Sequence, residues 1–240
     1  MVPPSVRAVV LDVGGVFFLP SPHHFRPALS AVGIESRPED AVWHRAHYVA
    51  TAALDRAGMA GAARPERWDA YLAAFAAEVV PGGMEAADFA PFWLGPSLDR
   101  WRWIQAPAVD ALRRLVGAGW PVAVVSNSDG TVEAALRERG VCQVGPGSGA
   151  RVLHVVDSHL VGVEKPDPAV FEPALAALAA DGIAREHCIY LGDTYVADVV
   201  GARAAGLHPV QIDPYGLYAD LDHDRVVSVD ELVDALLALR

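Results

Sequence analysis

The chain has 240 residues, of which 52% are hydrophobic, so it can bury a large core. Its formal net charge is −11. Such an acidic composition argues against nucleic acid or an anionic membrane as a partner, because both require a basic surface. No apolar run approaches the roughly eighteen residues of a membrane span, and Asp12 interrupts the N-terminal apolar run, so we expect no signal peptide. The sparse cysteines, Cys142 and Cys188, are typical of a reducing compartment, and we expect a cytoplasmic protein.

The segment Val6–Phe18 predicts the central strand of the protein. Its apolar run ends at a single carboxylate, Asp12, which is soon followed by Gly14 and Gly15. A continuous apolar run is typical of a strand buried on both faces of a parallel sheet. Asp12 is therefore expected at the carboxyl end of that strand, where open α/β sheets bind their ligands. Taken alone, the segment also fits an Asp that only caps a turn.

The next part of the chain has a different pattern, rich in Ala, Trp, Arg and Glu. Helix starts are predicted at residues 38–40 and 65–67, where a proline precedes acidic or basic residues. We therefore expect an all-helical domain of about four helices over residues 20–103. It is inserted into an α/β domain formed by residues 1–19 and 104–240.

Strands and helices alternate over the rest of the chain. Further strands are expected over 122–125, 152–156, 187–191 and 207–212, and helices over 108–118, 132–139, 168–180, 197–205 and 229–239. This alternation implies right-handed crossovers. The expected fold class is α/β, with a three-layer, Rossmann-like parallel sheet and an inserted helical domain. Pro209 lacks a backbone donor, which favours an edge position for the last strand.

Three polar clusters follow these predicted strands. They are Ser126-Asn127, a Glu-Lys-Pro-Asp-Pro run containing Lys165, and a segment from Gly192 to Asp198. The carboxyl ends of parallel strands share one edge of a sheet, so these clusters are expected beside Asp12. Lys165 is the single lysine among 19 basic residues, which suggests a position that needs a compact ammonium.

Together these segments resemble the motifs of the haloacid dehalogenase-like hydrolase superfamily, most of whose members are magnesium-dependent phosphatases. The matching motifs are Asp12-x-Gly-Gly-Val, Ser126-Asn127, Lys165-Pro-Asp-Pro and Gly-Asp193-x4-Asp198. The helical insert resembles the cap domain of that family. A cap would sequester a small substrate at the sheet edge.

The resemblance implies a set of metal ligands and a nucleophile. Asp12 would bind Mg²⁺ with one carboxylate oxygen and attack phosphorus with the other, which gives an aspartyl-phosphate. The backbone carbonyl of Gly14 and the carboxylate of Asp193 would complete the protein ligands. Asp198 would be an additional or water-mediated ligand, although the residue could instead be the N-terminal acid of a helix.

The resemblance also implies a phosphoryl-binding set. Ser126 and neighbouring groups of Asn127 and Gly15 would hold the phosphoryl oxygens, and Lys165 would supply positive charge to them and to Asp12. Ser126 and Asn127 could instead cap the helix that follows, because both residue types are favoured there.

One position departs from the family pattern. Family phosphatases usually carry an acid/base Asp two residues after the nucleophile, and here Gly14 occupies that position. A missing general acid typically costs about 10² to 10⁴ in rate. Four histidines of the insert could substitute: His23, His24, His44 and His47.

Three functions remain open from the sequence. The favoured one is a Mg²⁺-dependent phosphatase acting on a small phosphorylated metabolite. A metal-independent 2-haloacid dehalogenase is the second; such relatives also lack the second Asp, but the pair Asp193 and Asp198 would then have no explanation. The third is a catalytically weak binding or regulatory protein that keeps the fold.

Overall fold

The computed structural model describes residues 2–94 and 100–239, and the chain forms two compact units. Unit 1 contains Met1–Phe17, Gln105–Pro214 and Asp220–Arg240. Unit 2 contains Phe18–Ile104 and Tyr215–Ala219. Residues 215–219 lie outside the expected insert, yet they group with it.

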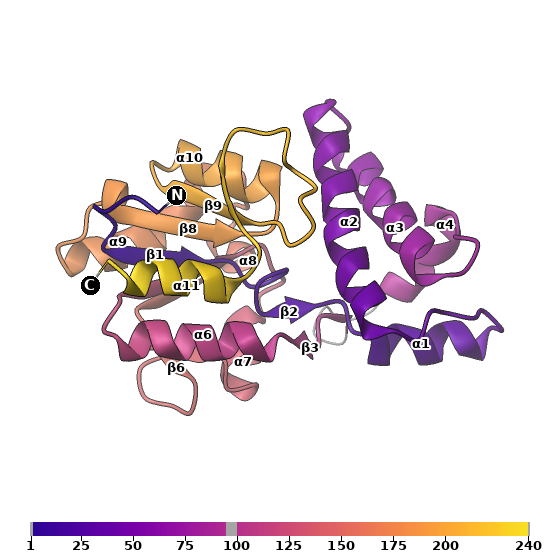
Figure 1. Ribbon diagram of the computed structural model, residues 1–240, viewed down its shortest axis with the longest axis horizontal. Helices are drawn as coiled ribbons and strands as arrows, with labels where there is room; N and C mark the ends of the chain where they lie inside the picture. The colour runs from indigo at the N-terminus through magenta and orange to yellow at the C-terminus, as the bar shows by residue number, and fades with distance from the viewer. Residues whose placement is uncertain (1, 95–99, 240) are drawn as a thin grey trace. The chain divides into compact units, whose positions relative to one another are not determined.

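Unit 1 is built on a six-stranded sheet of order β10-β9-β8-β1-β4-β7, in which every neighbouring pair is parallel (Figure 1). The strands are β1 (Ala8–Leu11), β4 (Val122–Ser126), β7 (His154–Asp157), β8 (Cys188–Gly192), β9 (His208–Ile212) and β10 (Asp224–Val226). Every residue of β1, β4 and β8 is buried, as their uninterrupted apolar runs predict. The expected α/β class with a Rossmann-like parallel sheet is confirmed.

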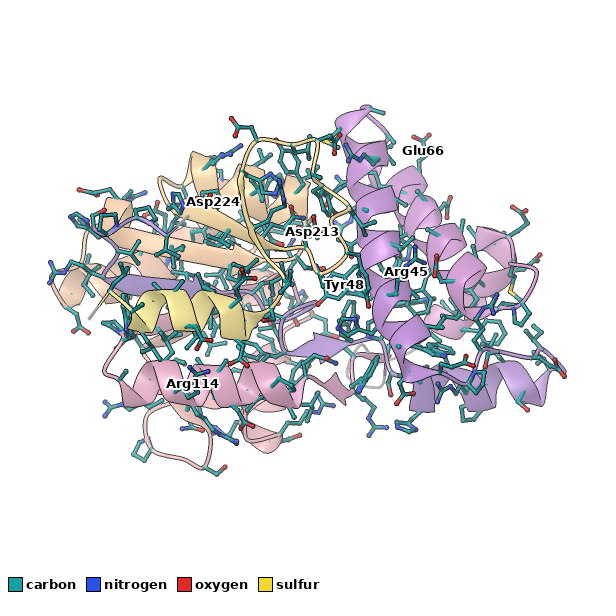
Figure 2. All side chains as sticks on the ribbon, viewed as in Figure 1. Arg45, Tyr48, Glu66, Arg114, Asp213 and Asp224 are labelled. Carbon is teal, nitrogen blue, oxygen red and sulfur yellow. The ribbon has the colours of Figure 1, made fainter. Side chains whose placement is uncertain are left out.

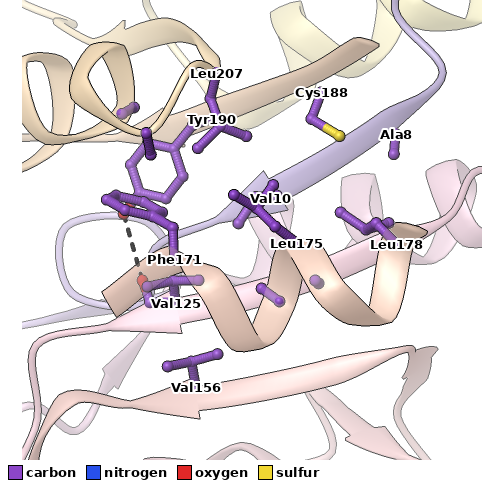
Figure 3. Close-up of a cluster of buried hydrophobic side chains, with 14 of the residues drawn as sticks. Ala8, Val10, Val125, Val156, Phe171, Leu175, Leu178, Cys188, Tyr190 and Leu207 are labelled. Atoms are coloured by element: carbon purple, nitrogen blue, oxygen red, sulfur yellow. Dashed lines mark hydrogen bonds between the residues drawn. The ribbon is translucent and has the colours of Figure 1, made fainter. Parts of the chain in front are cut away.

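Helices cover both faces of this sheet (Figure 1). They are α6 (Ala106–Gly117), α7 (Val132–Glu138), α8 (Ser158–Val161), α9 (Glu172–Ala180), α10 (Gly201–Ala204) and α11 (Val229–Leu237), with single turns η2 (Pro168–Phe171), η3 (Arg185–His187) and η4 (Tyr195–Val200). On one face α9 packs over alternate strand residues, where Leu175 and Phe171 lie close to Val10 and Tyr190 (Figure 3). Helices α6 and α11 lie side by side in front of the sheet (Figure 1).

An ionic contact joins α6 to α11. Arg114 of α6, labelled in Figure 2, lies 2.8 Å from Asp230 and also pairs with Asp234, and both acids belong to α11. Because all three side chains are between 45% and 65% exposed, water screens the attraction. The apolar face of α11, with Leu232 and Leu236 buried, is therefore the main reason that it docks.

Two strand predictions are wrong. Strand β9 is not at the edge, because β10 pairs with it on the side away from β8. The β9–β10 ladder begins at Val210, so Pro209 lies just outside it and its missing donor leaves no gap there. The segment expected as one strand over 152–156 is divided between β6 (Ala150–Val152), which pairs with β5 (Cys142–Val144), and β7 of the main sheet.

Unit 2 is mainly helical. Its elements are β2 (Phe18–Leu19), α1 (Pro22–Ala31), α2 (Asp40–Met59), α3 (Arg64–Val79), α4 (Ala86–Phe89), η1 (Ala90–Trp93) and β3 (Trp103–Ile104), and β2 and β3 form a short antiparallel pair. Phe25 is the centre of its core, with ring centroids of Trp43, Phe75 and Trp93 at 6.1, 5.9 and 5.0 Å. Residues 215–219 join this unit through Tyr218, whose hydroxyl donates to the buried Asp55 carboxylate at 2.7 Å.

Both cysteines are buried free thiols in separate strands. Burial raises the pKa of Cys142 to about 12 and that of Cys188 to about 11, so the thiolate that would bind metal or react is disfavoured at both positions. Among the helices of the described chain, none combines the length and the apolar character needed to cross a membrane.

Candidate active site

Three acidic side chains meet at the carboxyl edge of the sheet of unit 1. Asp12 directly follows β1, Asp193 directly follows β8, and Asp198 lies in η4. One carboxylate oxygen from each lies within 4.8 Å of the others, and all three residues are buried. The two central strands therefore bring together the acids that the sequence places after them.

Lys165 reaches this acidic cluster from the loop after α8. Its ammonium nitrogen lies 2.8 Å from Asp12 Oδ2, 2.7 Å from Asp198 Oδ1 and 2.8 Å from the Tyr190 hydroxyl. An ammonium has three donors, and here each has an acceptor. Burial disfavours the charged form, but the adjacent Asp12 and Asp198 carboxylates outweigh it and raise the pKa of Lys165 above its ordinary value.

Asp12 has one oxygen paired with Lys165 and one without a donor. Asp12 Oδ1 is buried and accepts no hydrogen bond from any described residue. Burial raises the pKa of Asp12 to about 7, and the charges of Asp198 and Asp193 act in the same direction, against the effect of Lys165. An unsatisfied buried carboxylate oxygen is costly and requires an explanation.

Asp198 has protein partners on both oxygens. Oδ1 accepts from Lys165 and from the Tyr190 hydroxyl at 2.9 Å, and Oδ2 accepts from the backbone N and hydroxyl of Thr194 at 2.9 and 2.6 Å. Although burial opposes ionisation, the bonds from Lys165 and Thr194 lower the pKa of Asp198. The sequence predicts a regular helix from residue 197, but η4 is a wider π turn. Thr194 precedes this turn, and its hydroxyl oxygen accepts from Asp198 N at 3.2 Å.

Two glycines provide the space for these carboxylates. A Cβ on Gly15, whose φ is +69°, would lie 2.2 Å from Asp193 Cγ, and a Cβ on Gly192 would lie 2.3 Å from Asp198 Cγ. Any side chain at either position would therefore displace an acid of the cluster. Gly14 lies in the same turn, between Asp12 and Gly15.

Ser126 and Asn127 are at the same edge of the sheet. Ser126 is the buried last residue of β4. The side chain of Asn127 accepts from the backbone N of Lys165 at 2.8 Å and donates to the backbone O of Lys165 at 3.1 Å. Asn127 thus fixes the backbone that carries the ammonium. The loop before α7 is held by Asp157, which accepts from Gly130 N at 2.9 Å and Val132 N at 3.2 Å.

Sequence reasoning missed several residues of this site. Tyr190 and Thr194 bind Asp198, and the fully buried Gln211 donates to the backbone O of Asp193 at 2.8 Å. The sequence feature that could have indicated Tyr190 and Gln211 is a polar side chain inside an apolar strand, because such a side chain requires a hydrogen-bond partner when it is buried.

The four histidines proposed as substitute acids all belong to unit 2. His23 and His24 lie in the first turn of α1. On α2, His44 Nδ1 lies 2.8 Å from the Tyr215 hydroxyl, and the buried His47 Nδ1 lies 3.0 Å from the Tyr71 hydroxyl. Burial lowers the pKa of His44, and the charge of His47 lowers it further. Each of the last two therefore has a tyrosine partner within its own unit.

Comparison with known proteins gives a consistent result. A family model described as haloacid dehalogenase-like hydrolase matches residues 6–206. Haloacid dehalogenase-like hydrolase domain-containing protein 3 of Homo sapiens is 33% identical over 113 residues, which cover 45% of this chain and 41% of that protein. Glyceraldehyde 3-phosphate phosphatase of Pyrococcus furiosus is 35% identical, over 35% of this chain and 33% of that protein. Phosphoserine phosphatase of Thermus thermophilus is 41% identical, over 29% and 27%. The chain thus spans less than half the length of these relatives.

Solved structures match along nearly the whole chain. A phosphatase from Thermococcus onnurineus has a TM-score of 0.54 at 15% identity, covering 96% of this chain and 98% of that one. The putative hydrolase YfnB from Bacillus subtilis, bound to magnesium, has 0.58 at 18%, with the same coverage. A dehalogenase has 0.54 at 19%, covering 98% of each chain. At these identities the likeness shows the fold alone, and the fold is common to phosphatases and dehalogenases.

Proposed function

Because the chain belongs to the haloacid dehalogenase-like hydrolase family, we propose that it is a Mg²⁺-dependent phosphatase of a small phosphorylated metabolite. The observation that carries this proposal is Asp12 Oδ1, a buried carboxylate oxygen without a donor beside two further acids. Two of the matched relatives are phosphatases by name, which supports the reaction class.

The acidic cluster fits Mg²⁺ by its donor chemistry. Three carboxylates that converge on one point repel one another, and Lys165 offsets only one of their charges. Mg²⁺ prefers oxygen ligands, and Asp12 Oδ1 and the Asp193 carboxylate would hold it, together with the backbone carbonyl of Gly14. Asp198, whose oxygens both accept protein donors, would contribute through water. When bound, the ion would neutralise charge on the phosphoryl group.

The protein groups then divide the reaction between them. Asp12 Oδ2 would attack phosphorus, forming an O–P bond as the bond from phosphorus to the leaving oxygen breaks. Lys165, 2.8 Å from that attacking oxygen, and the Ser126 hydroxyl would stabilise negative charge on the phosphoryl oxygens. Water would then cleave the aspartyl-phosphate, which releases phosphate and restores the Asp12 carboxylate.

Gly14 sets an expectation about the substrate. With no carboxyl group at this position to protonate the leaving oxygen, phosphate esters whose alcohol departs readily as an anion should react fastest. Aryl phosphates should therefore be better substrates than alkyl phosphates.

A dehalogenase is the second candidate, favoured by Gly14 and by the similar fold of a solved dehalogenase. In that reaction Asp12 would attack carbon without a metal. The grouping of Asp193 and Asp198 with Asp12 argues for the phosphatase instead, because Lys165 offsets only one of the three negative charges and a reaction without a metal leaves the others uncompensated.

One experiment separates these functions. Hydrolysis of p-nitrophenyl phosphate and of a panel of phosphorylated metabolites is measured with Mg²⁺ and with EDTA, beside chloride release from 2-chloropropionate. We expect Mg²⁺-dependent phosphate release that Asp12→Asn abolishes and that Asp181→Asn, a change at an exposed aspartate, leaves intact. Chloride release in EDTA would establish the dehalogenase. No turnover of any substrate, together with measurable Mg²⁺ binding, would favour the binding or regulatory protein.

A further inference from the structure

Tyr190 is a buried tyrosine that the proposed reaction does not use, yet its hydroxyl lies among the charged groups of the site. The oxygen accepts from Lys165 Nζ at 2.8 Å and lies 2.9 Å from Asp198 Oδ1 and 3.3 Å from the backbone O of Val125. Figure 3 shows the last of these contacts as a dashed line. The single hydroxyl proton is best directed at Asp198, because a bond to a carboxylate is shorter and stronger than one to a neutral carbonyl.

The tyrosine ring is held rigidly. Tyr190 is fully buried in β8, where its backbone pairs with Val10 on one side and Pro209 on the other. Its ring packs edge-on against Phe171, with centroids 5.1 Å apart. The hydroxyl therefore has a fixed position, set by the sheet and by η2.

Lys165, by contrast, has a long side chain with four rotatable bonds. Its ammonium would be free to pair more closely with one carboxylate if only Asp12 and Asp198 held it. The Tyr190 hydroxyl supplies the third acceptor, so the three N–H groups point at three fixed oxygens.

We infer that Tyr190 is a positioning residue, whose hydroxyl fixes the Lys165 ammonium between Asp12 and Asp198. This inference rests on the proposed function, because it assigns Tyr190 a part in turnover through Lys165. Without the hydroxyl, one buried N–H of Lys165 has no acceptor and Asp198 loses one donor. The ammonium then shifts from its place beside Asp12 Oδ2.

The kinetic test uses Tyr190→Phe, which keeps the ring and its packing. Hydrogen bonds to charged groups are strong enough that kcat for p-nitrophenyl phosphate should fall about 10- to 100-fold, with KM changed by less than about twofold. The matched control is Tyr218→Phe, which removes another buried hydroxyl bonded to an aspartate but lies in unit 2. It should keep the wild-type kcat. An unchanged kcat in Tyr190→Phe overturns the inference.

A second measurement needs no turnover and uses the single lysine of the chain. Protein labelled with ¹⁵N-lysine gives one side-chain ammonium signal in NMR, that of Lys165. We expect a sharp signal in the wild type and in Tyr218→Phe, because the side chain is 1% exposed and fully hydrogen-bonded. In Tyr190→Phe, proton exchange with water should be at least about tenfold faster, since a bond to the ammonium is lost.

The two readouts separate the claims. A lower kcat with an unchanged Lys165 signal shows that Tyr190 does not act through Lys165 and overturns the inference. If the wild type hydrolyses no phosphate ester, the proposed function fails. The NMR comparison then still decides the contact: faster exchange in Tyr190→Phe supports the positioning of Lys165, and unchanged exchange overturns it.

Discussion

Replacing Gly192 by Ala should damage the site without altering any polar group. The new Cβ would lie 2.3 Å from Asp198 Cγ and 2.5 Å from Asp198 Oδ2, whereas ordinary contacts begin at 3.4 Å. The Asp198 side chain must therefore move by about 1 Å or the β8 end must shift. Asp198 cannot then keep its bonds of 2.6 to 2.9 Å to Thr194, Tyr190 and Lys165.

The expected magnitude follows from these two effects. Overpacking alone costs typically about 1–3 kcal/mol, and each lost hydrogen bond to the buried charge adds about 1.5–3 kcal/mol. We expect Gly192→Ala to lower the free energy of unfolding by at least about 3 kcal/mol. A misplacement of about 1 Å at a catalytic group can reduce the rate about 100-fold, and kcat should fall by that factor or more.

Urea unfolding and hydrolysis of p-nitrophenyl phosphate measure the two losses. Gly117→Ala is the control, because Gly117 is exposed at the end of α6 and a Cβ there meets nothing within 4 Å. This control should leave kcat unchanged and alter stability by no more than about 1 kcal/mol, in the stabilising direction. If Gly192→Ala matches the control in both assays, the close approach of Asp198 to this glycine is refuted.

Three other substitutions test separate parts of the account. Gly14→Asp should raise kcat/KM for alkyl phosphates by up to about 10²-fold and for aryl phosphates by less, because a departing alkoxide needs a proton. Equal gains for both classes in steady-state assays would contradict the missing-acid explanation. Asn127→Ala removes both side-chain bonds to the Lys165 backbone, so unfolding in urea should show a loss of about 1–3 kcal/mol and kcat should fall; full activity would contradict this role. Phe25→Ala should destabilise the core of unit 2 by about 3–5 kcal/mol in thermal unfolding, because this ring is fully buried. Val32→Ala, at a 63% exposed position, should change stability by less than about 0.5 kcal/mol. Similar values for both variants would contradict the central place of Phe25.

The parts of the fold that could be predicted are those with strong local signals. Strands β1, β4 and β8 are uninterrupted apolar runs, and Asp12 and Asp193 follow two of them directly. Two rules, that such runs form central strands and that ligands bind at their carboxyl ends, were therefore enough to bring these acids to one edge.

The missed features depend on contacts between distant segments. A tyrosine in an apolar run gives no sign of whether its hydroxyl will meet Lys165, 25 residues away. Pro209 suggested an edge strand because it lacks a backbone donor, and nothing in the sequence marks the short β10 as the neighbour of β9. The Tyr218–Asp55 bond joins residues 163 positions apart, so no local pattern indicates that residues 215–219 group with the helical unit.

The formation of a phosphoenzyme on Asp12 is the most direct test of the proposed reaction. Protein mixed with p-nitrophenyl phosphate and Mg²⁺ is quenched in acid during turnover, digested and analysed by mass spectrometry. We predict one phosphoryl group on the peptide that contains Asp12, absent when EDTA replaces Mg²⁺ and absent in Asp12→Asn. Phosphate release by the wild type without any phosphorylated Asp12, or with the phosphoryl group on another residue, would contradict the account.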